Sequence, residues 1–569
     1  MNGVREGFAA GYACLTGWAD LLDRINVFPV ADGDTGANLR VSLAPLRDYE
    51  TSANATADRL SRCATGNSGN IAAAFFREFS LTIDSHDLAA NAALGSKKAW
   101  QAVARPCAGT MLTVFDRLAA TLASHPGLNG LYPLLCTELQ HAVLETSQLL
   151  PNMRKAGVVD SGALAMFIFF DGFFHHLTGQ TGLPASIPEL FAGTLAVKSS
   201  FCPEPTDSYC VDAVIQPVPG QALIKERIAQ LGDSVVMVAD AASLKIHLHT
   251  PDPLRLRTQL DALGTIVDWT DEAIEQGGLA QFAGSRKKQP IHIMTDSAGS
   301  LTRKMARDHS ITLMDSYIIA DGESGPESLY APDRIYSLMR MGKKVTTAQA
   351  SLFERHQHYR NICGQFGRTL YLCVGSAFTG NFATAVAWKE KHDPDNLLQV
   401  MDTGAASGRL ALIALCTARF ADRAGSPEEV IAFADQTSAA CEEYVFIDEL
   451  KYLAAGGRVS KAKGCFGDML HLKPVISPSS AGVRKLGVVR NRGGQLDFAL
   501  NKLLARFSHT DAPVIMLQYT DNQEWVTGLV RQQVKKLLPH AEVLLTPLSL
   551  TSGVHMGPGT WSMACAPPC

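Results

Sequence analysis

The spacing of apolar residues changes twice along this chain, and those changes constrain its fold more than any other feature of the sequence. Up to about residue 180, apolar residues recur every three or four positions, as in Leu134 to Leu150, which predicts helices. Val211 to Val218 and Ser234 to Val238 are predicted as strands, and Leu244 to His249 alternates apolar and polar residues with period two, with helix-like segments between and after these stretches. From Ile291 onward, strand and helix patterns alternate, which is typical of an α/β domain with a largely parallel sheet.

Two linkers separate these regions. The first, residues 183–207, carries several prolines, and the second, residues 284–290, is short, basic and ends in proline. We therefore predict a multidomain chain with an all-α domain at 1–182, a small α/β middle domain at 207–282 and an α/β domain at 290–569. A length of 569 residues agrees with this division, because single hydrophobic cores stop growing beyond roughly 250 to 300 residues.

Composition excludes several classes of protein. The hydrophobic share of 46% and charged share of 19% are those of an ordinary globular chain. The net charge is −4 without long basic runs, so nucleic-acid binding is not expected. No secretory signal is predicted at the amino end, and the most apolar stretch, Ala163 to Phe173, is too short to span a bilayer and contains Asp171. Thirteen scattered cysteines, without metal-finger spacing, predict reduced thiols and a cytoplasmic protein.

The most informative motif lies near the amino end. In Asp32-Gly33-Asp34-Thr35-Gly36, a glycine separates two aspartates, so that a tight turn can direct both carboxylates toward one point. Two carboxylates suit Mg²⁺, which completes its shell with water and phosphate. The same pattern, taken alone, is also common as an Asp-Gly turn that caps a helix.

Three further glycine-framed polar turns follow along the chain, and each precedes an apolar helical pattern. Helix N-termini of this kind bind anions, although each motif alone is most often a simple helix start. The motifs are Gly66-Asn67-Ser68-Gly69-Asn70, Gly109-Thr110-Met111-Leu112-Thr113 and Gly157-Val158-Val159-Asp160-Ser161-Gly162.

In this order, the four motifs resemble the DhaL-type nucleotide-binding domain of dihydroxyacetone kinases, and most closely its version in bacterial fatty acid kinases. The resemblance implies an all-α helical barrel that holds ATP across Mg²⁺, with Asp32 and Asp34 as metal ligands. Asn26 lies near the place where that family has a third acidic ligand. The residues that the resemblance places around the nucleotide are Asn38, Asn67, Ser68, Gly69, Thr110 and Asp160. One departure is that Ala163-Leu164-Ala165 replaces a glycine-rich continuation after Gly162.

The middle region contains a candidate zinc site. His247 and His249 are two residues apart in a predicted strand and therefore project from the same face, while Cys210 begins another predicted strand. One thiolate and two imidazoles are natural zinc ligands, but two histidines in a strand are more often ordinary surface residues. The segments around Cys210 and His247 resemble the middle domain of bacterial fatty acid kinases, which implies that these three residues bind Zn²⁺.

The C-terminal region resembles DegV-type lipid-binding proteins over its whole length from Pro290 to Cys569, and the resemblance implies a two-lobed α/β domain that binds a fatty acid. Thr347, Ser376 and His555 would hold the fatty acid carboxylate, and Arg458 would order the entrance or face the kinase. Each of these residues is, taken alone, more often a helix cap, a turn residue or a surface ion pair. A departure is Thr347-Ala348-Gln349-Ala350-Ser351, where the family often has Thr-Ser-Gln-Pro-Ser. The motifs that carry the resemblance are Thr295-Asp296-Ser297, residues 346–351, Gly375 to Gly380, Met401-Asp402-Thr403, Leu453 to Ser460, Leu472 to Val475 and His555 to Gly559.

Taken together, these resemblances imply a fatty acid kinase that transfers phosphate from ATP to a fatty acid carboxylate, with Asp32 and Asp34 at its centre. The cofactors expected are ATP, Mg²⁺ and Zn²⁺, and the partners are a fatty acid and a second copy of the chain, with lipid exchange at a membrane surface but no membrane span. Two alternatives remain open: a kinase for a small molecule such as dihydroxyacetone, and a lipid-binding carrier or regulator whose kinase half is inactive.

Overall fold

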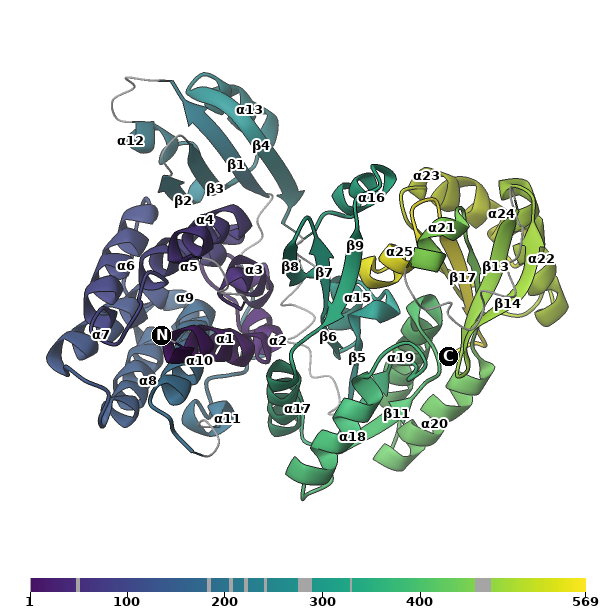
Figure 1. The fold of residues 1–569 in the computed structure, drawn as a ribbon, viewed down its shortest axis with the longest axis horizontal. Coiled ribbons are helices and arrows are strands. Elements are labelled where there is room, and N and C mark those ends of the chain that lie inside the picture. Colours follow the sequence, from purple (N-terminus) through teal and green to yellow (C-terminus); the bar gives the residue numbers. More distant parts are fainter. Residues whose placement is uncertain are drawn as a thin grey trace. The chain divides into compact units, whose positions relative to one another are not determined.

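The computed structural model describes residues 2–47, 52–181, 186–203, 208–218, 224–239, 243–274, 289–327, 330–455 and 472–569. It divides into two compact units, residues 1–285 and residues 286–569. The first unit contains the helical region and the middle region, and the second is an α/β unit (Figure 1). The multidomain architecture predicted from the sequence is therefore confirmed, with an all-α part, a small part with strands and a C-terminal α/β part.

The helical part of the first unit is built around α10. Almost every side chain of this helix is buried, because Ala163 to Phe173 is apolar on all sides and such a helix must lie inside a bundle. Asp171, the acid within this run, accepts a hydrogen bond from the Tyr132 hydroxyl at 2.7 Å. The helices are α1 (Asn2–Thr16), α2 (Ala19–Arg24), α3 (Thr35–Ser42), η1 (Ala44–Leu46), α4 (Ala53–Cys63), α5 (Gly66–Phe79), α6 (Leu88–Ala102), α7 (Met111–Ser124), α8 (Leu131–Leu149), α9 (Pro151–Ala156), α10 (Ser161–Leu177) and α11 (Ile187–Leu190).

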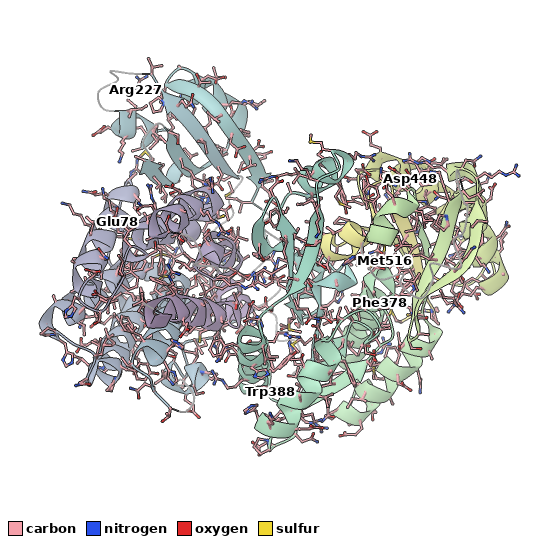
Figure 2. All side chains as sticks on the ribbon, viewed as in Figure 1. Glu78, Arg227, Phe378, Trp388, Asp448 and Met516 are labelled. Atoms are coloured by element: carbon pink, nitrogen blue, oxygen red, sulfur yellow. A yellow bond between two sulfur atoms is a disulfide. The ribbon has the colours of Figure 1, made fainter. Side chains whose placement is uncertain are left out.

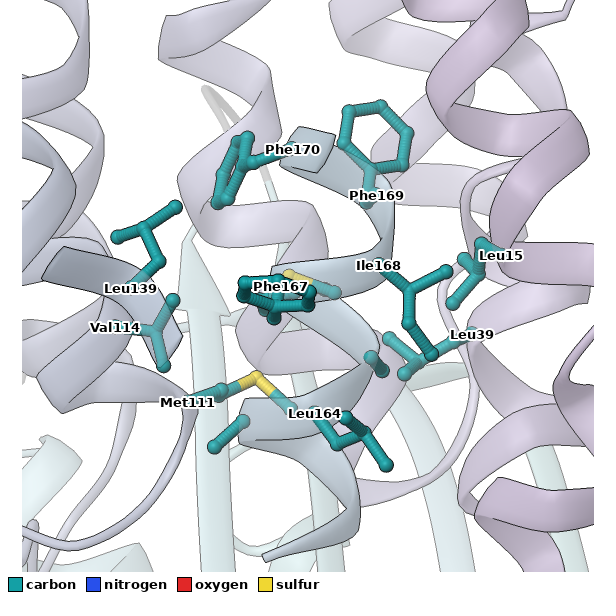
Figure 3. Close-up of a cluster of buried hydrophobic side chains, with 14 of the residues drawn as sticks. Leu15, Leu39, Met111, Val114, Leu139, Leu164, Phe167, Ile168, Phe169 and Phe170 are labelled. Carbon is teal, nitrogen blue, oxygen red and sulfur yellow. The ribbon is translucent and has the colours of Figure 1, made fainter. Parts of the chain in front are cut away.

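Aromatic side chains fill the core between α5, α7 and α10. Phe75 stacks on Phe115 with ring centroids 4.0 Å apart, and Phe170 lies edge-on to both. Figure 3 shows Phe167 and Phe170 of α10 beside residues of neighbouring helices in this core. Burial of each ring contributes roughly 1.5 to 3 kcal/mol to folding. Because this core fixes α5, α7 and α10 against one another, it also fixes the positions of their first turns, which the sequence predicted as anion-binding loops.

The middle part is a four-stranded antiparallel sheet in the order β2-β3-β1-β4. The three predicted strands are present, and β4, which was not predicted, lies at the sheet edge with most side chains exposed, so it lacks apolar alternation. The sheet is joined to the helical part by the backbone bond from Ala104 N–H to Val235 O, 3.0 Å. The elements are β1 (Tyr209–Pro217), α12 (Ile224–Ile228), β2 (Asp233–Ala239), β3 (Leu244–Thr250), α13 (Pro253–Asp261) and β4 (Gly264–Ala273).

The described residues of the second unit form three sheets. They are ordered β11-β10-β5-β6, β14-β13-β12-β17-β15-β16 and β8-β7-β9. The first half of the unit consists of β5 (His292–Asp296), η2 (Ser297–Gly299), α15 (Arg303–Asp308), β6 (Ile311–Met314), β7 (Ser316–Ala320), β8 (Glu323–Pro326), α16 (Pro332–Arg340), β9 (Val345–Gln349), α17 (Leu352–Phe366), β10 (Thr369–Cys373), α18 (Asn381–His392), β11 (Leu398–Asp402) and α19 (Ser407–Ala421).

The second half continues with α20 (Pro427–Ala440), β12 (Glu442–Phe446), α21 (Leu450–Ala455), β13 (Lys473–Ser479), β14 (Gly482–Val489), α22 (Arg492–Arg506), β15 (Val514–Tyr519), α23 (Gln523–Trp525), η4 (Val526–Val530), α24 (Arg531–Leu537), β16 (Glu542–Pro547), α25 (Leu550–Met556) and β17 (Trp561–Ala566).

The expectation of a largely parallel sheet holds for only part of this unit. The sheet β11-β10-β5-β6 is parallel throughout, but in the six-stranded sheet only β15 and β16 pair in parallel, and β8-β7-β9 is antiparallel. Alternation of strands and helices along the sequence does not reveal which strands become neighbours, so the sequence pattern overestimated parallel pairing.

Helix α19 holds the parallel sheet and the six-stranded sheet together. Its residues Leu410 to Ala418 are buried on all sides, and they share one core with β5, β10, β15 and β17. Met516 of β15 belongs to this core, and Phe378 packs against it (both labelled in Figure 2). The cysteines were predicted to be reduced, but Cys416 of α19 forms a disulfide with Cys569, their Cα atoms 5.4 Å apart. Folding brings together two thiols that are 153 residues apart in sequence.

The sequence predicted no segment that spans a membrane. None of the helices in the described ranges combines the length and the apolar character needed to cross a bilayer.

Candidate functional site

The two aspartates of the amino-terminal motif lie in the turn between α2 and α3. Asp34 occupies the N-cap position of α3, yet its side chain makes no capping hydrogen bond within the described residues. Asp23 of α2 performs that role, since its Oδ1 accepts hydrogen bonds from the backbone N–H groups of Gly36 and Ala37 at 2.7 and 3.1 Å. The Asp34 carboxylate is therefore not used to cap its helix, in contrast to the helix-cap interpretation of this motif.

Gly36 makes this arrangement sterically feasible. A Cβ atom at this position would lie 2.1 Å from the backbone oxygen of Ala19 in α2. Only a residue without a side chain lets α2 and α3 approach so closely. The glycine thereby brings the N-terminus of α3 to Asp23 and leaves Asp34 at the surface of the turn that faces the cavity described below.

Asp32 and Asp34 form a half-buried acidic pair. Burial raises the pKa of both carboxyl groups, and the charge of Asp32 raises the pKa of Asp34 further. Asn26 donates from Nδ2 to Asp32 Oδ1 at 2.5 Å, and its own Oδ1 is buried without a hydrogen-bond partner in the described part of the chain. Adjacent carboxylates that are partly withdrawn from water are stabilised in their charged form by a cation, so this donor set fits a divalent metal ion with oxygen ligands.

A cavity of about 780 Å³ opens beside this pair. Its walls come from the first turns of α3, α5, α7 and α10, from the α6–α7 loop and from β2 of the middle sheet. The lining residues are Asn26, Phe28, Pro29, Asp32, Asp34, Thr35, Asn67, Ser68, Ile71, Val103, Arg105, Cys107, Thr110, Met111, Leu112, Asp160, Ser161, Gly162, Ser234 and Val236.

The predicted nucleotide residues divide into two groups. Asn67, Ser68, Thr110 and Asp160 line the cavity, whereas Asn38 and Gly69 do not. A Cβ on Gly69 would meet the Ser42 hydroxyl at 2.0 Å, so Gly69 serves the close contact of α5 with α3. The side chain of Asn38 lies against Gly66, where a Cβ would be 2.0 Å from its Nδ2.

Some polar groups of the cavity are already used and others are not. Thr110 and Asp160 cap α7 and α10, as their side chains accept from Leu112 N at 3.4 Å and Ala163 N at 2.7 Å. Burial raises the pKa of Asp160 to about 7. The Ser68 hydroxyl is buried and has no hydrogen-bond partner among the residues that the structure describes, and such groups in native proteins usually meet a ligand or water. Arg105, missed by the sequence analysis, is the cationic side chain among the lining residues of this cavity.

The Cys-His-His set of the middle sheet comes together as predicted from period two. Cys210 lies opposite His249 in the β1–β3 register, and His247 projects from the same face of β3. The ligand atoms of these three side chains lie within 4.8 Å of one another, with Cys210 Sγ 3.8 Å from His247 Nε2. His249 Nδ1 is buried, and no described residue supplies it with a hydrogen-bond partner. The donor set and its spacing fit a zinc ion.

Asp212, another residue missed by the sequence analysis, connects this set to the first turn of α5, which lines the cavity. Its Oδ1 lies 3.2 Å from His247 Nδ1, and its Oδ2 accepts from the backbone N–H of Gly66 at 3.3 Å and from the Thr65 hydroxyl at 3.4 Å. Asp212 also accepts from Asn70 Nδ2 at 3.4 Å. The period-two pattern that pairs Cys210 with Asp212 was a signal that could have identified this residue.

The acidic pair and the Cys-His-His set influence each other electrostatically. Burial raises the pKa of the Cys210 thiol, and the nearby charges of Asp212, Asp34 and Asp32 raise it further. The two candidate cation sites are therefore within reach of each other's charge.

The second unit contains a larger cavity of about 1170 Å³. Apolar side chains such as Met314, Phe378, Val445 and Ile476 form much of its wall. A cavity with apolar walls and a few polar groups is typical of a site for a lipid or another amphipathic small molecule.

The predicted carboxylate contacts are only partly assembled at this cavity. Thr347 of β9 and His555 of α25 both line it, and Thr347 Oγ1 lies 2.9 Å from His555 Nε2. Ser376 is exposed and is not among the lining residues, and its backbone N–H donates to Asp402 Oδ1 at 3.0 Å. Arg458 lies outside the described residues, so its predicted role stays a prediction.

Comparison with protein-family models divides the chain into three parts. Residues 29–175 match the DAK2 domain, residues 206–276 match the FakA-like middle domain of fatty acid kinases, and residues 290–567 match the DegV family, described as uncharacterised protein.

Relatives match different parts of the chain. A DegV domain-containing protein of Streptococcus pyogenes serotype M1 is 27% identical over 279 residues, which is 47% of this chain and 95% of the relative. Protein YloV of Bacillus subtilis is 28% identical over 335 residues, which is 52% of this chain and 60% of YloV.

Solved structures resemble the chain over 49% of its length. A DegV family protein from Thermus thermophilus, described for its fatty acid binding, has 23% identity and a TM-score of 0.46, with 100% of that chain covered. DegV from Bacillus subtilis, described as a fatty acid-binding protein, has 20% identity and a TM-score of 0.45, also with 100% covered. The chain thus joins a DAK2 domain, a FakA-like middle domain and a DegV-family domain in one polypeptide.

Proposed function

We propose that this protein is a fatty acid kinase, which transfers the γ-phosphoryl group of ATP to the carboxylate of a fatty acid held in its own DegV-family domain. One observation carries the proposal: a cavity lined by a half-buried aspartate pair and a cavity with apolar walls and a polar Thr347–His555 pair occur in the same chain. The match of residues 206–276 to the FakA-like middle domain of fatty acid kinases supports this pairing of activities.

In the kinase half, each group would have a distinct task. Asp32 and Asp34, with Asn26 Oδ1 beside them, would hold Mg²⁺, which supplies neutralisation of charge on the phosphates when it is bound. The Ser68 hydroxyl and Asn67, at the start of α5, would donate hydrogen bonds to phosphate oxygens. The backbone N–H groups at a helix N-terminus also favour a bound anion. Arg105 would add a positive charge at the cavity wall.

In the lipid half, the Thr347 hydroxyl and His555 imidazole would bind the carboxylate, and the apolar wall would enclose the alkyl chain. A carboxylate is already an anionic nucleophile, so no general base is needed and His555 acts by orienting it. One carboxylate oxygen forms a bond to the γ-phosphorus while the bond from that phosphorus to the β,γ-bridging oxygen breaks. The products are an acyl phosphate and ADP.

We also propose that Cys210, His247 and His249 hold Zn²⁺. Asp212 would accept a hydrogen bond from His247 Nδ1, which leaves His247 Nε2 to bind the metal. A carboxylate is a usual hydrogen-bond partner for the second ring nitrogen of a metal-binding histidine. The metal content of the purified chain, measured by mass spectrometry before and after Cys210→Ser, tests this assignment. A wild-type protein without zinc would contradict it.

The kinase proposal is tested with the full chain, ATP, Mg²⁺ and palmitate, with hydroxylamine to trap acyl phosphate as the hydroxamate. Asp32→Asn is expected to abolish hydroxamate formation and leave palmitate binding unchanged, because Asp32 belongs to the first unit. Asp58→Asn, an exposed acid on α4, is the matched control with unchanged activity.

The same experiment separates the alternatives. Phosphorylation of dihydroxyacetone instead of palmitate would favour the small-molecule kinase, and palmitate retention without turnover would favour a carrier with an inactive kinase half. Either result contradicts the proposed function.

A further inference from the structure

The wall of the cavity in the second unit carries a cationic side chain that has no role in the proposed binding of a plain fatty acid. Arg355 lies in the first turn of α17 and lines the cavity, and its side chain and backbone together are only 8% exposed. It donates from one terminal nitrogen to Asn381 Oδ1 at 3.2 Å, at the start of α18. Lys and Arg are rarely buried unless a partner compensates their charge, so this position requires an explanation.

The charge of Arg355 is compensated within the protein. Asp296, at the end of β5, accepts from Asn381 Nδ2, from the Tyr371 hydroxyl and from the backbone N–H of Val374, each at 2.7 Å. Asn381 therefore connects the carboxylate of Asp296 to the guanidinium of Arg355. Because one buried negative charge already faces one buried positive charge, this network does not need a second anion.

One donor of the guanidinium is nevertheless left without an acceptor. Arg355 Nε is buried and has no hydrogen-bond partner among the described residues. A buried donor without an acceptor is unfavourable, and native proteins usually satisfy it with protein, water or ligand. Since Arg355 lines the cavity, a molecule bound there is the group that can supply the missing acceptor.

Further polar groups lie near Arg355 in the cavity wall. Asn381 and Thr379 line the same cavity, and the amide of Gln349 lies beside Gly380, at 3.7 Å from an added Cβ. We call Thr347 and His555 the carboxylate pair. Gln349, Arg355, Thr379 and Asn381 are called the arginine patch.

We propose that the cavity is built for an acyl chain that bears, in addition to its carboxylate, a neutral oxygen in a hydroxyl or keto group. This inference rests on the proposed function, in which the carboxylate pair binds the acid. The oxygen on the chain accepts from Arg355 Nε, and it is neutral because Asp296 already balances the guanidinium. A hydroxyl also donates to the carboxamide oxygen of Gln349 or to Thr379 in the same patch.

The test compares dissociation constants of the full chain for palmitate, for palmitates hydroxylated at successive carbons, for a keto analogue and for hexadecanedioate. One positional isomer is expected to bind on the order of tenfold tighter than palmitate, because it satisfies a buried donor. The measured quantity is the ratio of the two dissociation constants for each protein variant.

Three variants identify the responsible atom. The ratio is expected to fall to about one in Arg355→Lys, which keeps the charge but lacks Nε, and in Arg355→Met combined with Asp296→Asn, which keeps the network neutral. Arg360→Met, on the same helix but not among the cavity-lining residues, is the matched control with an unchanged ratio. Thermal melting of each variant verifies that the second unit is folded, and the double substitution avoids an unbalanced buried charge.

Several outcomes would overturn the inference. The inference is wrong if every hydroxylated isomer binds equally to or more weakly than palmitate. It is also wrong if hexadecanedioate binds more tightly than any neutral isomer. Loss of all palmitate binding in Arg355→Lys would assign the guanidinium to the carboxylate itself and also overturns it. Failure of the proposed function is distinguishable, because the wild-type chain would then bind palmitate without forming hydroxamate, or would not bind it at all.

Discussion

Asp212 offers the sharpest test of how the middle sheet and the proposed nucleotide site depend on each other. Its Oδ1 faces His247 Nδ1 and Asn70 Nδ2, and its Oδ2 faces Gly66 N–H and the Thr65 hydroxyl. Asp212→Asn preserves the shape of the side chain and replaces one oxygen with an NH₂ group. The amide can satisfy one pair of donors in each orientation but not both.

The two orientations of the new amide have different costs. If its oxygen faces Gly66, its NH₂ faces His247, which must then accept at Nδ1 and carry its proton on Nε2, the atom nearer to Cys210. A protonated nitrogen does not bind metal. If the oxygen faces His247 instead, the Gly66 N–H at the start of α5 meets an NH₂ group and loses its acceptor.

Loss of such a second partner typically lowers metal affinity by about 10- to 100-fold. This corresponds to about 1.4 to 2.8 kcal/mol of binding free energy. We therefore expect Asp212→Asn to weaken zinc binding by this factor, measured by competition with a chromophoric chelator. Binding of a fluorescent ATP analogue is expected to weaken in parallel, because Asp212 also holds the first turn of α5.

The control is Asp261→Asn, which makes the same charge change at an exposed position at the end of α13. It is expected to leave both affinities unchanged. Zinc and nucleotide affinities of Asp212→Asn within about twofold of the wild-type values would refute the proposed link, since loss of a second partner costs at least about tenfold. A loss of zinc affinity without any loss of nucleotide affinity would restrict Asp212 to a role in the metal site.

Further predictions concern stability and pH. Gly36→Ala is expected to destabilise the first unit in urea unfolding by about 1 to 3 kcal/mol, because its Cβ would meet the Ala19 oxygen at 2.1 Å. The control is Gly364→Ala, which is expected to be neutral or stabilising because the space around Gly364 is open. Phe170→Ala is expected to cost about 3 to 5 kcal/mol in the same assay, since the ring is fully buried. Burial raises the pKa of Glu327 from 4.5 to about 7, so the native state keeps a proton that the unfolded state releases, and stability falls as pH rises between those values. Glu327→Gln is expected to remove about 3 kcal/mol of that pH dependence. The measurement is the free energy of unfolding at a series of pH values, and the same dependence on pH in the variant and the wild type would contradict the prediction.

Local patterns in the sequence were sufficient for features that depend on neighbouring residues. The spacing of apolar residues every three or four positions predicted the helices up to about residue 180, and period two placed His247 and His249 on one face of a strand. The glycine between Asp32 and Asp34 predicted a turn that brings both carboxylates together, because a few φ and ψ angles fix that geometry locally.

Pairings between distant segments were beyond these patterns. Strand β4 has few buried side chains, so no alternation reveals it, and the mainly antiparallel six-stranded sheet depends on which strands meet after folding. Ser376 matches a motif but is exposed and outside the cavity lining, since its loop is held by Asp402.

The sequence by itself therefore determined the domain types, the helical core and the candidate ligands that lie within one turn or one strand, because periodicity and turn chemistry act over a few residues. Only the tertiary structure decided that Asp23 rather than Asp34 caps α3, that Asp212 joins the Cys-His-His set to α5, and that Arg355 lines the cavity of the second unit. The physical reason is that hydrogen bonds, charge balance and burial are properties of segments far apart in the chain, and packing alone brings those segments together.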